Sequence, residues 1–314
     1  MDINKKLIKI LRTRKPSSLT DSILRFLYWN PPLGLLRYHI CVSLKCPLFI
    51  RRVQGMRLAV NPILKGIHKD LLIHGSREPY STHIFRKELK RGMTVIDIGA
   101  NIGYYCLIES SIIGEEGIVY AVEPSYQNIK YLVLNLLLNS CKNVIVRTIA
   151  IGDKNGSVTF KIVEDAPNLS RVATSKDETK FKVAMKTLDS FVEEEKIGHV
   201  DFIRMDVEGF ECRILRGARK VLSSHLPKLF IEIHPSMMTD YGDSIESFLQ
   251  ELSSHGYKVK YAVWEPLTPT YLKCYKPQEN WLVIKGPLDP YEILTDNKLR
   301  NNFCRDWARL FLQR

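Results

Sequence analysis

The chain has 314 residues, of which 45% are hydrophobic and 25% charged, as is ordinary for a globular protein with a full core. Its seven cysteines include no Cys-x-x-Cys pair, which argues against a zinc knuckle or a disulfide framework and favours reduced thiols. The net charge of +12 is uneven, because residues 1–91 hold 19 basic and 5 acidic side chains whereas residues 92–314 hold 27 and 29. Such asymmetry is typical of a surface that meets phosphate or anionic lipid, or of a solvated face that only keeps a protein soluble.

The first 50 residues are expected to form a basic helical extension, interrupted at Pro31-Pro32 and at Pro47. Apolar residues recur at helical spacing among its lysines, and an aromatic patch runs from Phe26 to Trp29. Such a helix can lie in a membrane interface, or it can dock on the rest of its own chain. No apolar run is long enough to span a bilayer, and the basic residues leave no core for a signal peptide. We therefore expect a cytoplasmic protein or one peripheral on the inner membrane surface.

Three further regions follow the extension. Residues 51–91 form a lead-in with a strand at 57–60 and a helix at 79–89. Residues 92–290 alternate strands and helices, which predicts an α/β domain with a mostly parallel sheet and helices on both faces. The expected strands are 95–98, 118–123, 144–149, 200–206 and 229–234, and the expected helices are 103–113, 125–139, 211–223 and 244–255. Segments 257–263 and 280–284 are expected to pair as a C-terminal antiparallel edge, and residues 291–314 to form a helical tail.

A turn after the third strand leads into a second extended segment at 157–163. The polar stretch that follows, residues 164–179, carries Asn168 and Arg171. A long polar loop on such a sheet is commonly a substrate lid, although disorder explains it nearly as well.

The most informative stretch is VIDIGANIGYY at residues 95–105, where an apolar run ends in Asp97 and a turn with Gly99 and Gly103 precedes a helix. Glycine lets the backbone approach a ligand, and the unpaired N–H groups of the following helix point at it. Glu123 closes the next apolar run, about 20 residues past the glycine turn, where a carboxylate can accept both ribose hydroxyls of a nucleoside cofactor. The pattern predicts a ribose-bearing cofactor, the alternative being an ordinary strand–turn–helix joint.

The spacing also bears on which cofactor binds. Asn101 stands where a dinucleotide fingerprint needs its middle glycine, which argues against pyrophosphate, and Asp97 suits a cationic amino group better than a phosphate. Adenosine with an amino-acid tail, as in S-adenosylmethionine, fits better. Near the adenine we expect Ala150 and Ile151, with Asp153 either bonded to its exocyclic amine or serving the turn. The residues expected at the cofactor are Asp97, Gly99, Ala100, Asn101, Gly103, Tyr104, Glu123, Pro124, Ala150, Ile151, Asp153 and Asp206.

A second group of polar residues follows the last two parallel strands. Asp206 ends the fourth strand, Glu208 comes two residues later, and Glu232 and His234 project from one face of the fifth strand. Because ligands bind at the carboxyl ends of parallel strands, these side chains are expected to meet in one crevice. We expect His234 to be the general base, since imidazole titrates nearest neutral pH, with Asp206 and Glu208 as its catalytic partners. The alternatives are a magnesium site of Asp206, Glu232 and His234, or a network that only orders the crevice.

These motifs resemble the FkbM family of S-adenosylmethionine-dependent methyltransferases. The resemblance runs from about residue 66 to residue 234 and rests on VIDIGANIGYY, VEP at residues 122–124, VDFIRMDVEGFE at 200–211 and EIH at 232–234. It implies a class I methyltransferase, Rossmann-like fold. Because the family consists mostly of O-methyltransferases, it also implies methylation of a hydroxyl on a sugar, glycolipid or polyketide-like acceptor, without choosing among them.

Two other functions stay open as alternatives. An NAD-type oxidoreductase on a similar sheet is disfavoured by Asn101 and by the absent third glycine. A non-catalytic methyltransferase-like module, binding membrane or nucleic acid through its basic extension, would need a damaged cofactor site, yet every expected position is filled. Nucleic acid as acceptor is disfavoured because no aromatic side chain stands at the end of the fourth strand to stack on a flipped base. The expected partners are a small-molecule, glycan-linked or lipid-linked acceptor and, through the extension, an anionic membrane.

Overall fold

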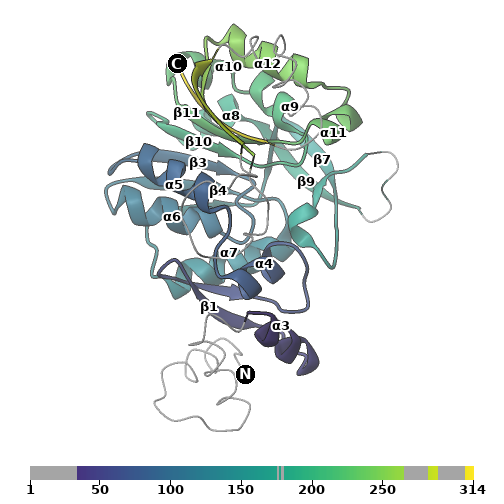
Figure 1. The fold of residues 1–314 in the computed structure, drawn as a ribbon. Coiled ribbons are helices and arrows are strands. Elements are labelled where there is room, and N and C mark those ends of the chain that lie inside the picture. The colour runs from purple at the N-terminus through teal and green to yellow at the C-terminus, as the bar shows by residue number, and fades with distance from the viewer. Residues whose placement is uncertain (1–33, 175–176, 178–179, 265–281, 289–307) are drawn as a thin grey trace.

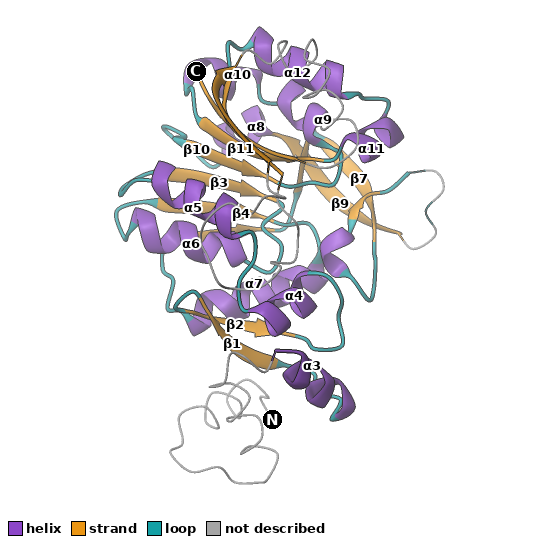
Figure 2. Ribbon diagram, in the orientation of Figure 1, coloured by secondary structure: helices purple, strands orange, loops and turns teal. Residues whose placement is uncertain are grey.

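The computed structural model describes residues 34–174, 177, 180–264, 282–288 and 308–314. These residues form three layers, in which a central twisted sheet lies between two groups of helices (Figure 1). Figure 2 shows the strands of this sheet crossing the middle of the molecule, with a second, smaller sheet beside their ends. Residues 1–33, most of the expected basic extension, lie outside the described residues.

The first described elements form a lead-in unit beside the main sheet. The expected strand at 57–60 and helix at 79–89 are confirmed, and residues 34–43 are helical as expected for the extension. A strand at residues 49–53 was not expected; it forms a hairpin because Gln54 and Gly55 both take up the left-handed backbone of a tight turn. The elements of this unit are α3 (Gly34–Ser43), β1 (Phe49–Val53), β2 (Met56–Val60), α4 (Ile67–His74) and α5 (Pro79–Glu88).

The main sheet has the strand order β13-β12-β14-β11-β10-β3-β4-β5. Its five parallel strands confirm the five that the sequence predicts, with ends that differ by one or two residues: β3 (Thr94–Ile98), β4 (Ile118–Val122), β5 (Val144–Arg147), β10 (Phe202–Met205) and β11 (Lys228–Ile233). The predicted antiparallel edge is also confirmed, since β12 (Lys258–Trp264) pairs antiparallel with β13 (Leu282–Leu288). The fold is therefore the class I methyltransferase type of α/β architecture that the motifs imply.

The end of the chain differs from the expected helical tail. Residues 308–313 form β14 (Ala308–Gln313), which lies between β11 and β12 and is antiparallel to both. Leu310, Phe311 and Leu312 are almost completely buried, so this strand is covered on both faces and its apolar run carries no alternation that would distinguish it from a helix. The sheet domain thus extends to residue 313 rather than 290, while residues 291–307 of the expected tail lie outside the described residues.

Helices cover both faces of the sheet. Those predicted at 103–113, 125–139 and 244–255 are confirmed as α6 (Tyr104–Ile113), α7 (Tyr126–Leu138) and α12 (Ile245–Ser254). The single helix expected at 211–223 is two, α9 (Glu211–Arg216) and α10 (Arg219–Ser224). They part at Gly217, where a Cβ would lie 2.0 Å from the backbone oxygen of Gly152, so the chain approaches the second sheet too closely for any side chain. Not predicted were α8 (Leu188–Glu194), α11 (Pro235–Met238) and the 3₁₀ turns η2 (Pro167–Leu169) and η3 (Thr239–Tyr241).

The second sheet has the order β6-β9-β7-β8. The extended segment expected at 157–163 is confirmed in it as β7, but its longest strand, β9, was not expected. The stretch expected to be a polar loop contains η2 and β8, with residues 175–176 and 178–179 outside the described residues. The strands are β6 (Ala150–Gly152), β7 (Gly156–Lys161), β8 (Arg171–Val172) and β9 (Lys180–Thr187).

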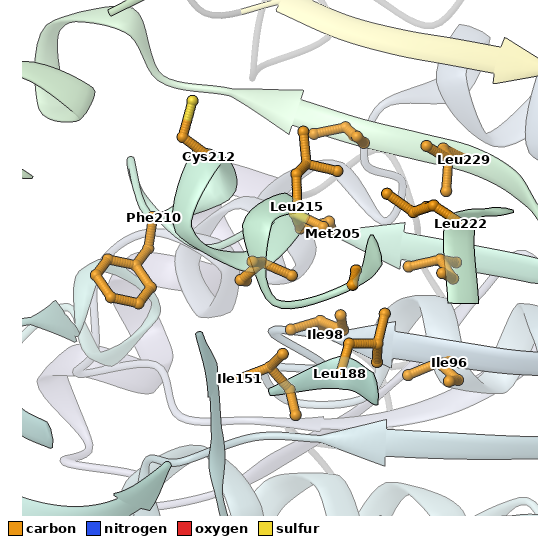
Figure 3. Close-up of a cluster of buried hydrophobic side chains, with 14 of the residues drawn as sticks. Ile96, Ile98, Ile151, Leu188, Met205, Phe210, Cys212, Leu215, Leu222 and Leu229 are labelled. Atoms are coloured by element: carbon orange, nitrogen blue, oxygen red, sulfur yellow. The ribbon is translucent and has the colours of Figure 1, made fainter. Parts of the chain in front are cut away.

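The core has two parts because successive side chains of a strand point to opposite faces of the sheet. Ile96 and Ile98 of β3 point to the face covered by α8, α9 and α10, where Leu215 and Leu222 pack in the cluster drawn in Figure 3. Val95 points to the other face, which α5, α6 and α7 cover. In the part of the chain that the structure describes, no helix is both long and apolar enough to cross a bilayer.

Candidate active site

A cavity lies at the carboxyl ends of the parallel strands, between the main sheet and the second sheet. It holds about 560 Å³ of empty space, part of it open to solvent. Its walls come from the loops after β3, β4 and β10 and from β6, β7 and β8. Among the residues expected at the site, those that line the cavity are Gly99, Asn101, Glu123, Pro124, Ala150, Ile151, Asp206 and Glu208.

The glycine turn brings two strand ends together at this cavity. Gly99 has a φ of +82°, and a Cβ on it would lie 1.9 Å from the backbone oxygen of Asp206. Any side chain would therefore force the loops after β3 and β10 apart. Asn101 is also left-handed, with a φ of +54°, and its backbone N–H donates a 2.8 Å hydrogen bond to Glu123. This uncommon conformation for a side-chain-bearing residue aims an N–H group at the carboxylate.

Glu123 is held rigidly at the cavity wall. Its carboxylate accepts hydrogen bonds from the backbone N–H groups of Asn101 and Ser125, each at 2.8 Å, and from the side-chain amide of Asn128 at 3.3 Å. Burial raises the pKa of Glu123 to about 7, against the lowering effect of these hydrogen bonds. A carboxylate has about four lone-pair positions, so acceptor capacity remains for a ligand hydroxyl.

Asn128 of α7 is a site residue that the sequence analysis missed. It lines the cavity, and its amide group donates to Glu123 and to the backbone oxygen of Pro167, both at 3.3 Å. Its Oδ1 is buried without a hydrogen-bond partner among the described protein atoms. A buried acceptor left unpaired costs about 1–3 kcal/mol, so this atom fits a ligand that donates a hydrogen bond. No motif marks the residue, because it comes from the first turn of a helix rather than from a strand end.

The rest of the wall beside Glu123 is apolar. Ile149, Ala150 and Ile151 follow β5, and Phe160 and Phe210 face them across the cavity opening from β7 and the start of α9. Flat apolar walls next to a hydrogen-bonding carboxylate suit a nucleoside, whose base stacks while its ribose is bound. The cavity therefore fits the adenosine part of the expected cofactor. Phe160 and Phe210 were not predicted, because neither lies in the strand-end pattern.

Asp97 does not have the position expected for it. It is completely buried, accepts a 2.9 Å hydrogen bond from Arg204 and a 3.0 Å contact from the thiol of Cys106, and does not line the cavity. The expected contact with a cationic amino group is thus made by Arg204 of the chain itself. The reason is the strand register, which places Arg204 directly opposite Asp97.

Four other expected cofactor residues also lie outside the cavity wall. Asp153 forms an ion pair with Arg213 at 2.8 Å, so the turn-forming alternative describes it better than an adenine contact. Ala100 and Gly103 belong to the buried turn, where a Cβ on Gly103 would lie 2.5 Å from Leu132. The hydroxyl of Tyr104 donates to the backbone oxygen of Arg77 at 2.9 Å, on the helix-covered face. These residues shape the turn without touching the cavity.

His234 lies where it was expected, at the end of β11, but its charge is not what a base needs. Its Nδ1 is 3.0 Å from Glu211, and its Nε2 is 3.6 Å from Glu208 and 3.8 Å from Glu232. Burial alone would lower the pKa of His234, but the hydrogen bond to Glu211 and the three negative charges raise it to about 10. Near neutral pH the ring is therefore a cation that already holds both protons. The general-base role expected for His234 stays a prediction, and the raised pKa argues against it.

Glu208 has the properties that His234 lacks. Its side chain is 13% exposed, lines the cavity and follows Asp206 by two residues. Burial and the neighbouring carboxylates raise the pKa of Glu208 to about 7, although the charge of His234 lowers it. A carboxyl group that titrates near neutral pH can take up or release a proton under working conditions.

Two buried arginines hold the other carboxylates. Arg204 reaches Asp97 and Asp206, each at 2.9 Å, and its guanidinium lies over the ring of Tyr105. Burial alone would lower the pKa of Arg204, but the charges of Asp97 and Asp206 hold it well above its usual value.

The second arginine comes from the other end of the sequence. Arg309 of β14 lies opposite Glu232 in the strand register and contacts it at 3.2 Å, while also reaching Glu78 of the lead-in at 2.9 Å. The sequence analysis missed both arginines. Arg204 carried a signal, since it stands two residues before Asp206 and so on the same face of the strand, whereas Arg309 carried none.

The three residues of the metal alternative do come together. Ligand atoms of Asp206, Glu232 and His234 lie within 4.8 Å of one another. However, Asp206 is paired with Arg204, and Glu232 is paired with Arg309. A divalent ion would have to displace these two cations, so these residues fit magnesium poorly.

Comparison with known proteins agrees with the motifs. The model of the methyltransferase FkbM domain matches residues 97–259, about half of the chain. No curated protein matches the chain. Among solved structures, a methyltransferase FkbM from Methylobacillus flagellatus is 24% identical over 56% of this chain, with a TM-score of 0.39; the match spans 42% of that protein's length.

Two other solved structures are more distant in sequence. Fibrillarin from Aeropyrum pernix, in complex with natively bound S-adenosyl-L-methionine, is 14% identical over 85% of this chain and 94% of its own, with a TM-score of 0.39. An S-adenosylmethionine-dependent O-methyltransferase from Thermotoga maritima is 13% identical over 87% of this chain and 80% of its own, also with a TM-score of 0.39.

Proposed function

The chain belongs to the FkbM family of S-adenosylmethionine-dependent methyltransferases, and from its site we propose that it methylates a hydroxyl group on a sugar, glycolipid or polyketide-like acceptor. The observation that carries the proposal is Glu208, a carboxyl group at the cavity wall whose pKa is raised to about 7. The acceptor classes are those that the family resemblance implies.

The cofactor supplies an electrophilic methyl group on a sulfonium, and the cavity offers separate places for its parts. Glu123 and Asn128 would bind the ribose, and Ile149, Ala150 and Ile151 would line the adenine. Because Asp97 is completely buried and does not line the cavity, we assign the amino group of the tail to Asp206, which lines the cavity and shares Arg204 with Asp97. The glycine turn around Gly99 brings that carboxylate to the wall.

Glu208 is assigned the role of general base. A hydroxyl group attacks a methyl carbon poorly while it keeps its proton, so a positioned carboxylate that accepts the proton raises the rate by about 10²–10⁴. The proton would move from the acceptor oxygen to Glu208 as the new carbon–oxygen bond forms and the bond between the methyl carbon and the sulfonium sulfur breaks, with S-adenosylhomocysteine as the leaving group. Its raised pKa makes Glu208 a stronger base than an ordinary carboxylate, and His234 keeps part of the population ionised.

His234, Glu211 and Glu232 are assigned positioning roles. The imidazolium is held by Glu211 at 3.0 Å and faces Glu208 at 3.6 Å, which limits where the base can lie. Arg309 in turn holds Glu232. These residues act through Glu208 and do not line the cavity themselves.

The test uses the full-length protein and a cofactor labelled in its methyl group. Candidate acceptors are free sugars, glycolipids, polyketides and extracted lipid-linked glycans, each incubated with wild type and with Glu208→Gln. Glu115→Gln, on a side chain 86% exposed, is the matched control. The proposal expects label in a methyl ether, which survives alkaline hydrolysis, and its loss only in Glu208→Gln.

Other outcomes would reject specific parts of the proposal. Label that alkali releases would be a methyl ester, and label in protein or nucleic acid would assign another acceptor class. Loss of turnover in EDTA with recovery in magnesium would favour the metal alternative over Glu208. Partners and location follow the acceptor: a lipid-linked glycan would place the enzyme at the inner membrane surface, and a free sugar in the cytoplasm.

A further inference from the structure

The helix α3 exposes an apolar face. Three of its large apolar residues are exposed: Leu35 at 60%, Leu36 at 49% and Val42 at 38%. Leu36 follows Leu35 directly and Val42 comes seven residues after Leu35, so all three lie on one side of the helix. Leu44, 46% exposed, lies in the turn that follows the helix. We call Leu35, Leu36, Val42 and Leu44 the α3 face.

The opposite side of α3 is fixed to the rest of the protein. Arg37 and Cys41 are buried, and Arg37 donates a 2.8 Å hydrogen bond to the backbone oxygen of Leu72 in α4. Gly34 approaches the backbone of Ile73 so closely that a Cβ would lie 2.1 Å from its oxygen. The α3 face is therefore presented on a helix whose position is set by packing, at the end of the molecule that Figure 1 shows lowest.

The α3 face accounts for a large part of the exposed apolar side chains. Of the eleven large hydrophobic residues that are exposed in the described part of the chain, four belong to it. Single exposed apolar residues are normal on protein surfaces, but a group of them on one helix marks an interaction site.

The charge around the α3 face has one sign. Residues 34–69 contain seven lysines and arginines and no aspartate or glutamate. Lys45 follows Leu44 directly and is exposed, and the ammonium group of Lys69 in α4 lies 5.2 Å from the ring of Tyr38 in α3. Lys65 of the same stretch pairs with Asp165 at 2.5 Å. An apolar strip bordered by cations is complementary to a surface that is apolar inside and anionic outside.

We propose that the α3 face docks on an anionic membrane surface. The leucines enter the boundary between headgroups and acyl chains, where amphipathic helices with basic flanks lie, while Lys45 and Lys69 contact lipid phosphates. With ten residues, α3 is far too short to span the bilayer, so the contact is peripheral and reversible. The inference is independent of methyl transfer and of the assignment of Glu208.

The test is co-sedimentation of the full-length protein with vesicles of phosphatidylcholine alone or mixed with phosphatidylglycerol. Wild type should sediment with the anionic vesicles only, and added salt should release it because screening shortens the reach of the charges. Leu35→Asn combined with Leu36→Asn removes the apolar contact, and Lys45→Glu combined with Lys69→Glu removes the charge contact. Because each cation near an anionic surface is worth about a fivefold gain in binding, the charge pair should weaken partitioning by at least about 25-fold.

Matched controls keep the test specific. Leu226→Asn changes another exposed leucine, 47% exposed, and Lys142→Glu reverses another exposed charge, 79% exposed, and both should sediment as wild type does. Sedimentation of the α3 variants equal to wild type would overturn the proposal, even if the protein binds through residues 1–33. So would a dimer that the leucine variants dissociate, because the α3 face would then meet a second copy. Loss of thermal stability in the leucine variants without vesicle binding by wild type would show that the chain itself covers this face.

Discussion

Two buried histidines in this protein have opposite charge states, and their surroundings explain why. His68 of the lead-in packs against the ring of Tyr131 and accepts a hydrogen bond from the backbone of Asn61, and burial lowers its pKa to about 4. His234 is almost as well buried, yet three glutamates raise its pKa to about 10. The side chain is the same, so burial alone does not decide its protonation; the nearby carboxylates do.

The buried arginines of the two regions repeat this contrast. Arg51 of the lead-in donates to backbone oxygens of Leu71 and Leu72, and burial, with the nearby charge of Arg37, lowers its pKa to about 9. Arg204 of the site instead binds two aspartates and keeps its charge. The surroundings of His68 and Arg51 in the lead-in thus consist of apolar packing and hydrogen bonds to backbone groups, whereas His234 and Arg204 belong to a network of charges. Changes in the site should therefore have the larger consequences.

The largest effect is expected for Glu208→Gln. If Glu208 is the base, turnover should fall by about 10²–10⁴-fold while binding of S-adenosylhomocysteine is nearly unchanged. The wild-type rate should fall as the pH drops below about 7, because the carboxyl group is then protonated and cannot accept another proton. Turnover against pH and calorimetric binding measure both. An unchanged rate, or a profile that is flat between about pH 5 and pH 8, would assign the base elsewhere.

The next largest effect is a difference in unfolding free energy between variants of Arg204 and of Arg51. Arg204→Met leaves Asp97 and Asp206 buried without their cation, and breaking a buried pair in this way costs about 3–5 kcal/mol of unfolding free energy. Arg51→Met leaves only carbonyl oxygens unpaired, which costs about 1–3 kcal/mol. Urea denaturation of both variants measures the difference, with Arg91→Met, on an exposed pair with Glu116, as the control that should unfold like wild type. Equal losses for the two buried arginines would remove the contrast between the regions.

A smaller effect is expected at the cofactor side of the cavity. Glu123→Gln keeps the shape of the side chain, but its amide N–H₂ faces one of the two backbone N–H groups that donate hydrogen bonds to the carboxylate in wild type. Affinity for S-adenosylhomocysteine should fall by about 1.5–3 kcal/mol, the scale of a hydrogen bond to a charged group. Calorimetry on the folded variant measures this loss. Affinity equal to wild type would mean that the ribose does not bind there.

The cofactor side could be predicted from sequence because its parts are local. Gly99, Asn101 and Glu123 come from two successive strand–turn–helix joints, and spacing along the chain was enough to bring them together. The fold was predictable for the same reason, since each parallel strand is a short apolar run with a helix after it. The strands that escaped include β1, β9 and β14. The apolar run of β14 has no alternation that would distinguish it from a helix. In β9, Phe181, Val183 and Met185 do alternate with polar or small residues, so this strand carried a signal that the sequence analysis missed.

For the carboxylate side of the cavity, the sequence predicts which residues meet but not their charges or their partners. Glu232 and His234 meet Glu208 as expected, yet the charge on His234 depends on Glu211 as well, and the pairing of Asp97 depends on strand register. Arg309 arrives from the last strand, about 75 residues further along the chain than Glu232. No local motif records such a partner.

The last prediction tests the two histidines directly by NMR of protein labelled with ¹⁵N-histidine, with His68→Gln and His234→Gln to assign the signals. Between about pH 6 and pH 9, His234 should show the shifts of a doubly protonated ring and His68 those of a neutral one.

The two pKa shifts also make the stability of the fold depend on pH, in opposite directions. His234 stabilises the fold fully below its unfolded pKa of about 6.5, and this contribution is lost as the pH rises toward about 10. His68 acts in the opposite direction, because its neutral ring must be protonated as the pH falls from about 6.5 toward 4. If His234 instead titrates near 6.5, the three glutamates do not hold its proton, and the imidazole rather than Glu208 becomes the candidate base.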